Sequence, residues 1–156
     1  MGKFATGVAV VTTGSESRPQ GMTVNSLTSV PLDPALILVS LMPDARTTRA
    51  IFEHDHYAVS ILSTRQQDIA LRFAQRGEDH FAGLPLEFCE HAVPVVPGEL
   101  AHVECVLDRG VVAGDHVLML GRVLRTCDRL GEPLIYYSGQ FGRVQRDDKD
   151  SDYWFF

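Results

Sequence analysis

The sequence has little of what several protein classes depend on. Only three of its 156 residues are cysteines, and Cys89, Cys105 and Cys127 lie far apart without a C-x-x-C pair. Neither a disulfide framework nor a zinc site is therefore indicated. The longest apolar runs, around 35–42 and 117–120, have the length of a strand and not of a membrane-spanning helix. We expect a cytoplasmic protein with reduced thiols and no membrane segment.

Basic residues are also scarce. Fourteen lysines and arginines stand against twenty aspartates and glutamates, which gives a net charge of −6. Without a basic stripe to neutralise phosphates, nucleic acid is excluded as a partner. The G-x-G-x-x-G signature of Rossmann domains and the G-x-S-x-G elbow of serine hydrolases are absent as well.

A metal site is not predicted. The segment His54-Asp55-His56 offers two imidazoles and a carboxylate, which are groups that bind zinc or iron. These residues span only a helix end and a strand start, and no further His or Cys has a recognisable ligand spacing.

The pattern along the chain predicts one mainly β domain. The size and the 45 % hydrophobic content are normal for a single compact core. Because few strands alternate with helices, an antiparallel β-barrel with short helices fits better than a parallel sheet. Strands are expected over 5–13, 23–30, 36–41, 57–62, 101–107, 116–126 and 133–138. Two helices are expected, over 45–54 with Asp44 as its cap, and from Ser63 or Thr64 as its cap through Arg76.

Uncharged polar residues gather in the stretch 21–29, GMTVNSLTS, directly after a hydrophobic run. Buried hydroxyl and amide groups cost free energy unless they find hydrogen-bond partners. In a single strand, alternation would send Thr23, Asn25 and Leu27 to one face, and Val24, Ser26 and Thr28 to the other. The stretch is either a solvent-facing strand or a surface against which a polar, uncharged group lies.

A cationic helix start follows the apolar strand that ends in Ser40-Leu41-Met42. The first turn of a helix presents unpaired N–H groups, and Arg46 with the hydroxyls of Thr47 and Thr48 adds donors suited to a phosphate. The alternative is an ordinary capped surface helix with a solvated arginine.

Three further features invite a chemical interpretation. Gly114-Asp115-His116 precedes an apolar strand, although a histidine after a Gly-Asp turn is more often structural. Phe141 lies close to Gly139, where an aromatic ring can stack on a planar group. Phe73 shares a helix face with Ile69, which indicates core packing.

Taken in order, the segments GVAVVTT, GMTVNSLTSV, ALILVSLMPDARTTRAI, RFA, GDH and PLIYYSGQFG resemble the flavin reductase family. The resemblance runs from about Gly2 to Gly142, and its strength lies in the order of the motifs. It implies a split antiparallel, Greek-key-like β-barrel with a few short helices over 1–145, followed by an acidic and aromatic tail over 146–156. A helix usually precedes the first strand in this family, so we expect that part of the domain to be missing here.

The resemblance also implies an activity, an NAD(P)H:flavin oxidoreductase that passes hydride from reduced nicotinamide to FMN or FAD. The reduced flavin would then supply a partner monooxygenase. With no Rossmann signature, the nicotinamide cofactor would be a transient substrate. A homodimer is implied because so small a barrel leaves much of a flavin exposed. Two alternatives stay open: an oxidase or electron carrier of the same fold that keeps its FMN, and a non-enzymatic binding module.

The family pattern assigns roles to individual residues. It implies flavin contacts for Thr23, Val24, Asn25, Ser26, Ser40, Leu41, Arg46, Thr47, Thr48 and Phe73. It implies that His116 is the catalytic or nicotinamide-positioning residue and that Phe141 lies beside the nicotinamide. A serine commonly stands in the family where this chain has Ala45, which leaves the choice between FMN and FAD open.

Overall fold

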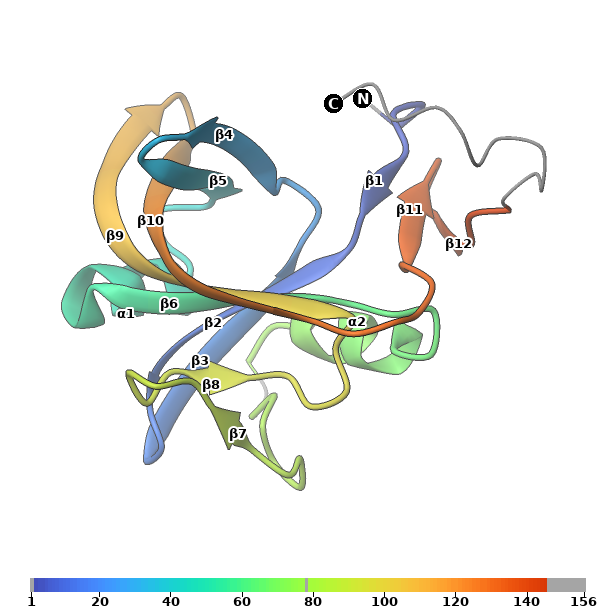
Figure 1. The fold of residues 1–156 in the computed structure, drawn as a ribbon, viewed down its shortest axis with the longest axis horizontal. Helices are drawn as coiled ribbons and strands as arrows, with labels where there is room; N and C mark the ends of the chain where they lie inside the picture. Colours follow the sequence, from blue (N-terminus) through green and yellow to red (C-terminus); the bar gives the residue numbers. More distant parts are fainter. Residues whose placement is uncertain (1, 78, 146–156) are drawn as a thin grey trace.

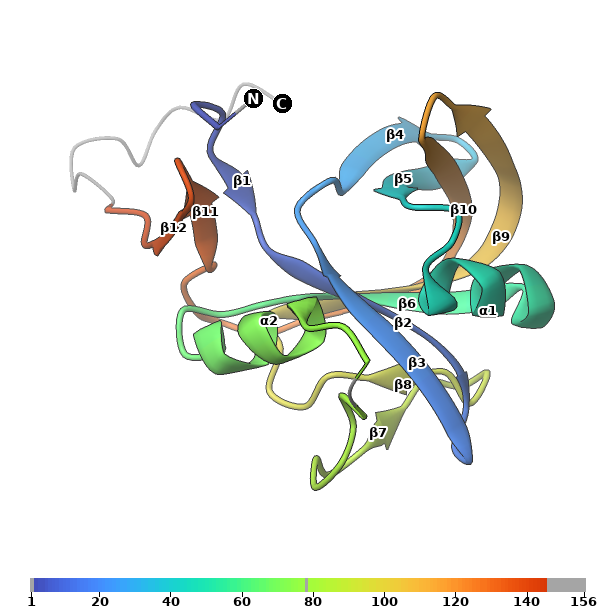
Figure 2. The same cartoon turned by 180° about the vertical axis from the view of Figure 1, so that it is seen from behind.

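The computed structural model describes residues 2–77 and 79–145, which form a mainly β protein with two short helices (Figures 1 and 2). The strands are β1 (Thr6–Gly7), β2 (Ala9–Ser15), β3 (Arg18–Val24), β4 (Thr28–Leu32), β5 (Ala35–Leu41), β6 (His56–Ile61), β7 (Glu87–Phe88), β8 (Pro94–Val95), β9 (Ala101–Ala113), β10 (His116–Asp128), β11 (Ile135–Tyr137) and β12 (Gln140–Gly142). The helices are α1 (Arg46–His54) and α2 (Gln67–Ala74).

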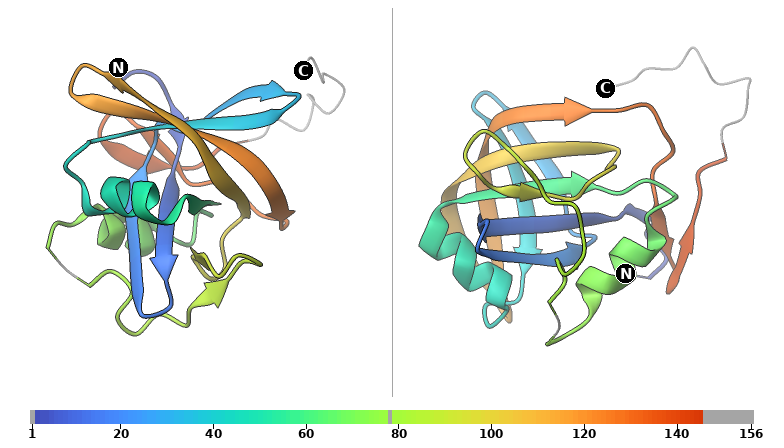
Figure 3. Two further views of the ribbon diagram at one scale, coloured as in Figure 1. Left: turned by 90° about the vertical axis from the view of Figure 1, so that its left-hand side faces the viewer. Right: turned by 90° about the horizontal axis from the view of Figure 1, so that it is seen from below.

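Seven strands form the main sheet, in the order β3-β2-β6-β9-β10-β5-β4, and all of its pairs are antiparallel. The long strands β9 and β10 curve strongly and carry β5 and β4 over the rest of the sheet (Figures 1 and 3). Two register irregularities in the β9–β10 ladder, after Leu120 and after Val123, accompany this curvature, as bulges commonly do. Two small sheets, β1-β11-β12 and β7-β8, complete the fold.

The core has two main parts, one on each side of β2. Ala9 and Val11 belong to a cluster that includes Ile51 of α1. Val8 and Val10 belong to a second cluster, which contains Phe73 of α2. Successive side chains of a strand point to opposite faces, so these two clusters cover both faces of β2. This explains why apolar residues follow one another in β2 without alternating with polar ones.

The stretch 23–30 is not a single strand, so that prediction was wrong. β3 ends at Val24 because its partner β2 begins at Ala9, which lies opposite Val24. Residues 25–27 connect β3 to β4, and the predicted alternation of side chains therefore fails. Leu27 packs partly buried against the core, whereas Asn25 is exposed.

The predicted helix caps were also wrong. Ala45, with an extended backbone (φ −64°, ψ 139°), precedes α1, and within the described residues no side chain caps that helix. α2 begins after Gln66, not after Ser63 or Thr64, and it ends at Ala74. Ser63 instead forms a β-bridge with Pro133 and donates its N–H to the Gln66 side chain at 3.0 Å.

The last strands differ from the prediction mainly in length. β9 and β10 run further than expected because they form one long hairpin through Gly114, whose φ of +63° suits a glycine. The predicted strand over 133–138 is replaced by the short hairpin β11–β12. The tail over 146–156 lies outside the described residues. In the described part of the chain, neither helix is long and apolar enough to cross a membrane.

Two of the three cysteines should be unreactive in the folded protein. Burial, helped by the Glu104 carboxylate, raises the pKa of the Cys89 and Cys105 thiols from 9.0 to about 12. The thiolate is the reactive form, so a thiol reagent at about pH 8 should modify exposed Cys127 first. Because the unfolded thiols ionise at lower pH than the folded ones, the free energy of unfolding should also fall as the pH rises from 9 toward 12.

Mass spectrometry of native and denatured samples after a short labelling pulse tests the thiol prediction. One modified cysteine in the native protein and three in the denatured protein are expected. Rapid modification of Cys89 or Cys105 in the native protein would contradict it.

Candidate functional site

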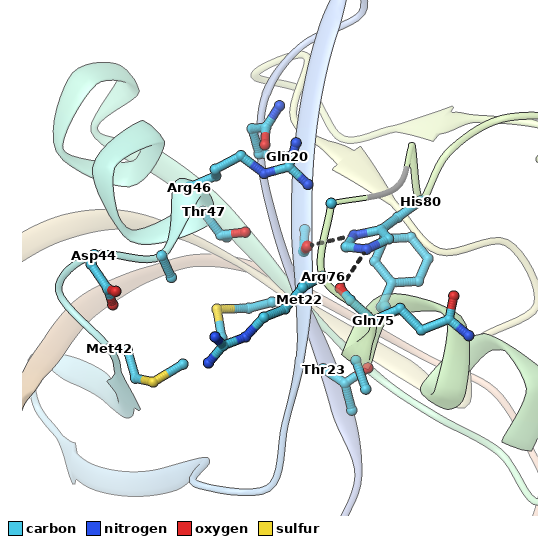
Figure 4. Close-up of a pocket in the computed structure, with 15 residues that line it drawn as sticks. Gln20, Met22, Thr23, Met42, Asp44, Arg46, Thr47, Gln75, Arg76 and His80 are labelled. Atoms are coloured by element: carbon cyan, nitrogen blue, oxygen red, sulfur yellow. Dashed lines mark hydrogen bonds between the residues drawn. The ribbon is translucent and has the colours of Figure 1, made fainter.

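A cavity of about 460 Å³ lies between β3, the start of α1 and the segment that follows α2 (Figure 4). Its size is in the usual range for small-molecule sites. Its walls are formed by Gln20, Gly21, Met22, Thr23, Met42, Asp44, Ala45, Arg46, Thr47, Phe73, Ala74, Gln75, Arg76, Gly77 and His80. Three segments that are far apart in sequence thus share one site.

One wall of the cavity is formed by Gly21 and aromatic rings. A Cβ atom at Gly21 would lie 2.8 Å from Cε1 of Phe73 and 3.2 Å from Cζ of Phe81. The two phenylalanine rings pack edge to face with centroids 5.0 Å apart. A larger residue at position 21 would push these rings away from β3, so the glycine is needed for this wall.

His80 holds the segment after α2 against β3. Its Nδ1 lies 3.1 Å from the carbonyl oxygen of Gly21, and its Nε2 lies 2.9 Å from that of Gln75 (dashed lines in Figure 4). The side chain is buried. A neutral imidazole donates one of these bonds, and a protonated one donates both. No sequence motif points to this residue, because its role depends on a contact between residues 59 positions apart.

The opposite wall suits an anion. Arg46 and Thr47 belong to the first turn of α1, which contains no acidic residue, and its N–H groups are not capped by a side chain of the described residues. Arg76 lines the cavity from the segment after α2, while Asp44 contributes one carboxylate. Helix N–H donors and guanidinium groups together are suited to a phosphate.

Four predicted flavin-contact residues meet in this cavity, namely Thr23, Arg46, Thr47 and Phe73. The Thr23 hydroxyl donates to the carbonyl oxygen of Ala70 at 2.7 Å and so also joins β3 to α2. Phe73 is a core residue and also lines the cavity, and its contact with a flavin stays a prediction.

Other predicted contact residues have packing or bonding roles in the described structure. Ser26 donates its hydroxyl to the carbonyl oxygen of Ser40 at 3.0 Å and accepts the N–H of Ser40 at 3.1 Å. The Thr48 hydroxyl donates to the carbonyl oxygen of Met42 at 2.8 Å. Val24 and Leu41 are core residues, and Asn25 is exposed in the connection after β3.

His116 does not line the cavity, but its neighbour on β10 pairs with a residue beside the cavity wall. The next residue along β10, Val117, pairs with Leu41 of β5. Leu41 is followed by Met42, which is part of the cavity wall. The Nδ1 of His116 lies 2.8 Å from Oδ1 of Asp115, and this hydrogen bond, followed by the charge of the ring, lowers the pKa of the Asp115 carboxyl. The bond directs the Nε2 side of the ring away from Asp115.

Phe141 has a different environment. Its ring packs against Tyr136, with centroids 5.5 Å apart, and beside the core cluster that contains Phe73. The residue is only partly buried, and it lies on the small sheet β1-β11-β12.

Residues 1–145 match a family model described as "Flavin reductase like domain". The chain belongs to the flavin reductase family. It is 42 % identical over 146 residues to the FMN reductase (NADH) SmoA of Agrobacterium fabrum, covering 94 % of this chain and 83 % of that protein. It is 37 % identical to an NADH-dependent flavin reductase of a Rhodococcus species, covering 99 % and 89 % of the two.

Among solved structures, this flavin reductase domain is similar to nitrilotriacetate monooxygenase component B from Mycobacterium thermoresistibile. The TM-score is 0.92 at 31 % identity, and the match covers 98 % of this chain and 87 % of that one. The family and the mainly antiparallel β fold predicted from the motifs are therefore confirmed.

The cavity of this flavin reductase domain fits a flavin by its chemistry. Gly21, Met22 and Phe73 offer an apolar surface at one side, and Arg46 with the first turn of α1 offers anion donors at the other. A flavin nucleotide has the same two ends, a planar ring and a phosphate. The residues present thus match both parts of the group.

Proposed function

We propose that the protein is an NAD(P)H-dependent flavin reductase that supplies reduced flavin to a partner monooxygenase. The observation that carries the proposal is the single cavity that joins an aromatic and glycine wall to a cationic helix start. The net reaction converts NAD(P)H, a proton and oxidised flavin to NAD(P)⁺ and reduced flavin. The flavin supplies the hydride acceptor, and the protein supplies binding and alignment.

In this proposal each of the three segments around the cavity has its own role in binding the flavin. Gly21 and Phe73 hold the ring, with Thr23 at its edge, and Arg46 and Thr47 hold the phosphate. His80 keeps the segment after α2 in place through its contacts with β3. The network between Ser26 and Ser40 fixes the connection after β3 at the side of the site.

His116 is proposed to position the nicotinamide. Its bond to Asp115 leaves Nε2 as the ring nitrogen for a substrate amide, and the pairing of the next residue, Val117, with Leu41 beside the wall residue Met42 supports this role. Phe141 stays a proposed nicotinamide contact, which would require the donor to reach from β10 toward the small sheet.

A homodimer and a cytoplasmic location are also part of the proposal. Met42, a wall residue, is 37 % exposed, and Val112, the next-to-last residue of β9, is 78 % exposed. Burying apolar surface of this kind favours association, and a second subunit would shield a bound flavin. The three cysteines are free thiols, which is compatible with a reducing compartment.

The test of the activity is oxidation of NADH and NADPH by the purified protein with added FMN, FAD or riboflavin. Turnover that depends on free flavin is expected. Stoichiometric flavin retained through gel filtration, together with no response to added flavin, would favour the oxidase or electron-carrier alternative. Failure to bind any flavin would leave only a binding module.

The substitution His116→Ala should raise the KM for the nicotinamide cofactor about tenfold, because one substrate hydrogen bond is lost. The Kd for flavin should stay within about twofold. As a matched control, Asp115→Asn keeps a side-chain oxygen that accepts the Nδ1 proton and should have a smaller effect. Full turnover of His116→Ala at low nicotinamide concentration would show that this residue has no positioning role.

A further inference from the structure

A separate cavity lies at the other end of α2 from the proposed flavin site. It has a volume of about 500 Å³ and shares no residue with the cavity proposed to bind the flavin. Four parts of the chain form its walls, namely 63–65 before α2, 98–100 before β9, 129–132 after β10, and Arg143 after β12. We call it the Arg143 cavity. Its size suits a small molecule.

Backbone hydrogen bonds join the walls of the Arg143 cavity. The N–H of Leu100 donates to the carbonyl oxygen of Ile61 at 2.8 Å, and the N–H of Arg129 donates to that of Leu100 at 2.8 Å. The N–H of Thr64 donates to the carbonyl oxygen of Glu132 at 2.9 Å. These segments are therefore fixed relative to one another without a ligand, which lowers the entropic cost of binding one.

Three arginines from three of these segments line the cavity, namely Arg65, Arg129 and Arg143. Nη2 of Arg129 lies 3.9 Å from Oε1 of Glu99 and 3.7 Å from Oε2 of Glu87. Arg65 and Arg143 are exposed, and neither forms an ion pair with a described residue. Guanidinium groups match the geometry of carboxylates, so these two arginines favour a ligand with two anionic groups.

Two carboxylates also line the cavity, and they differ in exposure. Glu132 is exposed to solvent, whereas the Glu99 side chain is only 1 % exposed. Oε1 of Glu99 lies 2.8 Å from Nδ1 of His102, but its Oε2 is buried and has no hydrogen-bond partner among the described residues. A buried carboxylate oxygen costs free energy unless a donor reaches it. Glu99 therefore points to a ligand that carries a hydrogen-bond donor.

We propose that the Arg143 cavity binds an amino dicarboxylate, which is a small molecule with two carboxylates and one amino group. The two carboxylates pair with Arg65 and Arg143, and the ammonium group donates to the Glu99 carboxylate. A dicarboxylate without an amino group leaves Glu99 without its donor, and an amino monocarboxylate leaves one guanidinium group unused. The proposal does not depend on the flavin chemistry, because the two cavities have separate walls.

The test is isothermal titration calorimetry with L-glutamate at constant ionic strength. The unmodified protein should bind it saturably, and Arg143→Gln should raise the Kd about tenfold because a charge-assisted hydrogen bond is lost. Arg143 is exposed, so the variant should fold normally. Arg122→Gln replaces an exposed arginine outside the cavity and is the matched control, for which the Kd should stay within about twofold.

Two analogues of L-glutamate test the roles of its groups without changing buried Glu99. Glutarate lacks the amino group and γ-aminobutyrate lacks one carboxylate, so each should bind about tenfold more weakly than L-glutamate. The Kd for FMN, measured by quenching of flavin fluorescence, should be the same for Arg143→Gln and the unmodified protein, because Arg143 does not line the proposed flavin cavity.

Four results would overturn the proposal. These are no saturable binding of L-glutamate up to about 10 mM, binding of glutarate as tight as that of L-glutamate, equal losses in Arg143→Gln and Arg122→Gln, and a loss of FMN affinity in Arg143→Gln as large as the loss of L-glutamate affinity. If L-glutamate binds as expected while NAD(P)H is not oxidised, the proposed function fails and the assignment of the Arg143 cavity stands.

Discussion

Replacing Arg46 with glutamine should raise the Kd for FMN about 20-fold and leave the Kd for riboflavin within about twofold. Arg46 lies in the first turn of α1 and lines the cavity that is proposed to bind the flavin. A hydrogen bond between a guanidinium group and a phosphate is charge-assisted and contributes roughly 2 kcal/mol. Binding should be weakened and not abolished, since the uncapped N–H groups of α1 remain.

Titrations of both flavins, again by fluorescence quenching, measure this difference. Arg122→Gln removes an exposed arginine of β10 that does not line the cavity, so it controls for the change in net charge. If the affinity for riboflavin falls as much as that for FMN, Arg46 shapes the ring site and does not bind the phosphate. If FMN binding is unchanged, the phosphate lies elsewhere.

The family and the strand-rich fold could be predicted because they depend on local patterns. β2 is a short apolar run with both faces covered, and α1 begins one residue later than predicted. Four of the predicted flavin-contact residues, Thr23, Arg46, Thr47 and Phe73, line one cavity, and they belong to segments with recognisable motifs.

The break between β3 and β4 could not be predicted from the stretch itself. β3 ends at the residue opposite Ala9, where its partner β2 begins, and this limit depends on the register of the hairpin. Ser26 looked available to a ligand in the sequence, yet the backbone of Ser40 satisfies its hydroxyl. Whether a polar side chain is available to a ligand depends on which backbone groups the tertiary structure brings within hydrogen-bond distance of it.

His80 and the residues of a smaller cavity between α1 and the β2–β3 hairpin show the same limit. Arg18 and Glu53 stand in segments that carry no motif, and only the packing of α1 on the β2–β3 hairpin brings them to one cavity. Buried Glu104 is another residue whose contact could not be predicted: its Oε1 lies 2.8 Å from Nδ1 of His91. Its position inside β9 gives no sign in the sequence that a histidine partner will reach it.

Replacing Gly121 with alanine should lower the free energy of unfolding by about 3 kcal/mol. A Cβ atom at this position would lie 2.0 Å from Oη and 2.6 Å from Cζ of Tyr57, and 3.0 Å from Cβ of Cys105. Tyr57 is completely buried, and its neighbours on β6 and β9 leave it little room to move. The register of the β9–β10 ladder also shifts just before Gly121, so this glycine lies where the sheet curves.

A double-mutant cycle with Tyr57→Phe tests whether this contact causes the loss. The Tyr57 hydroxyl is buried and has no hydrogen-bond partner among the described residues, so Tyr57→Phe alone should change stability by less than about 1 kcal/mol. Combined with Gly121→Ala it should recover about 1 kcal/mol, because it removes the nearest atom. Urea unfolding followed by circular dichroism measures all three variants.

Gly142→Ala is the matched control, because a Cβ there would meet nothing within 4 Å. Its effect should stay within about 0.5 kcal/mol. An equal loss at Gly142, or strictly additive effects of Gly121→Ala and Tyr57→Phe, would show that the close approach of the Tyr57 ring to β10 is not what requires a glycine. Coupling between the two positions would instead mean that the Tyr57 ring of β6 limits how closely Gly121 of β10 can approach it, at the point where the β9–β10 ladder shifts register and the sheet curves.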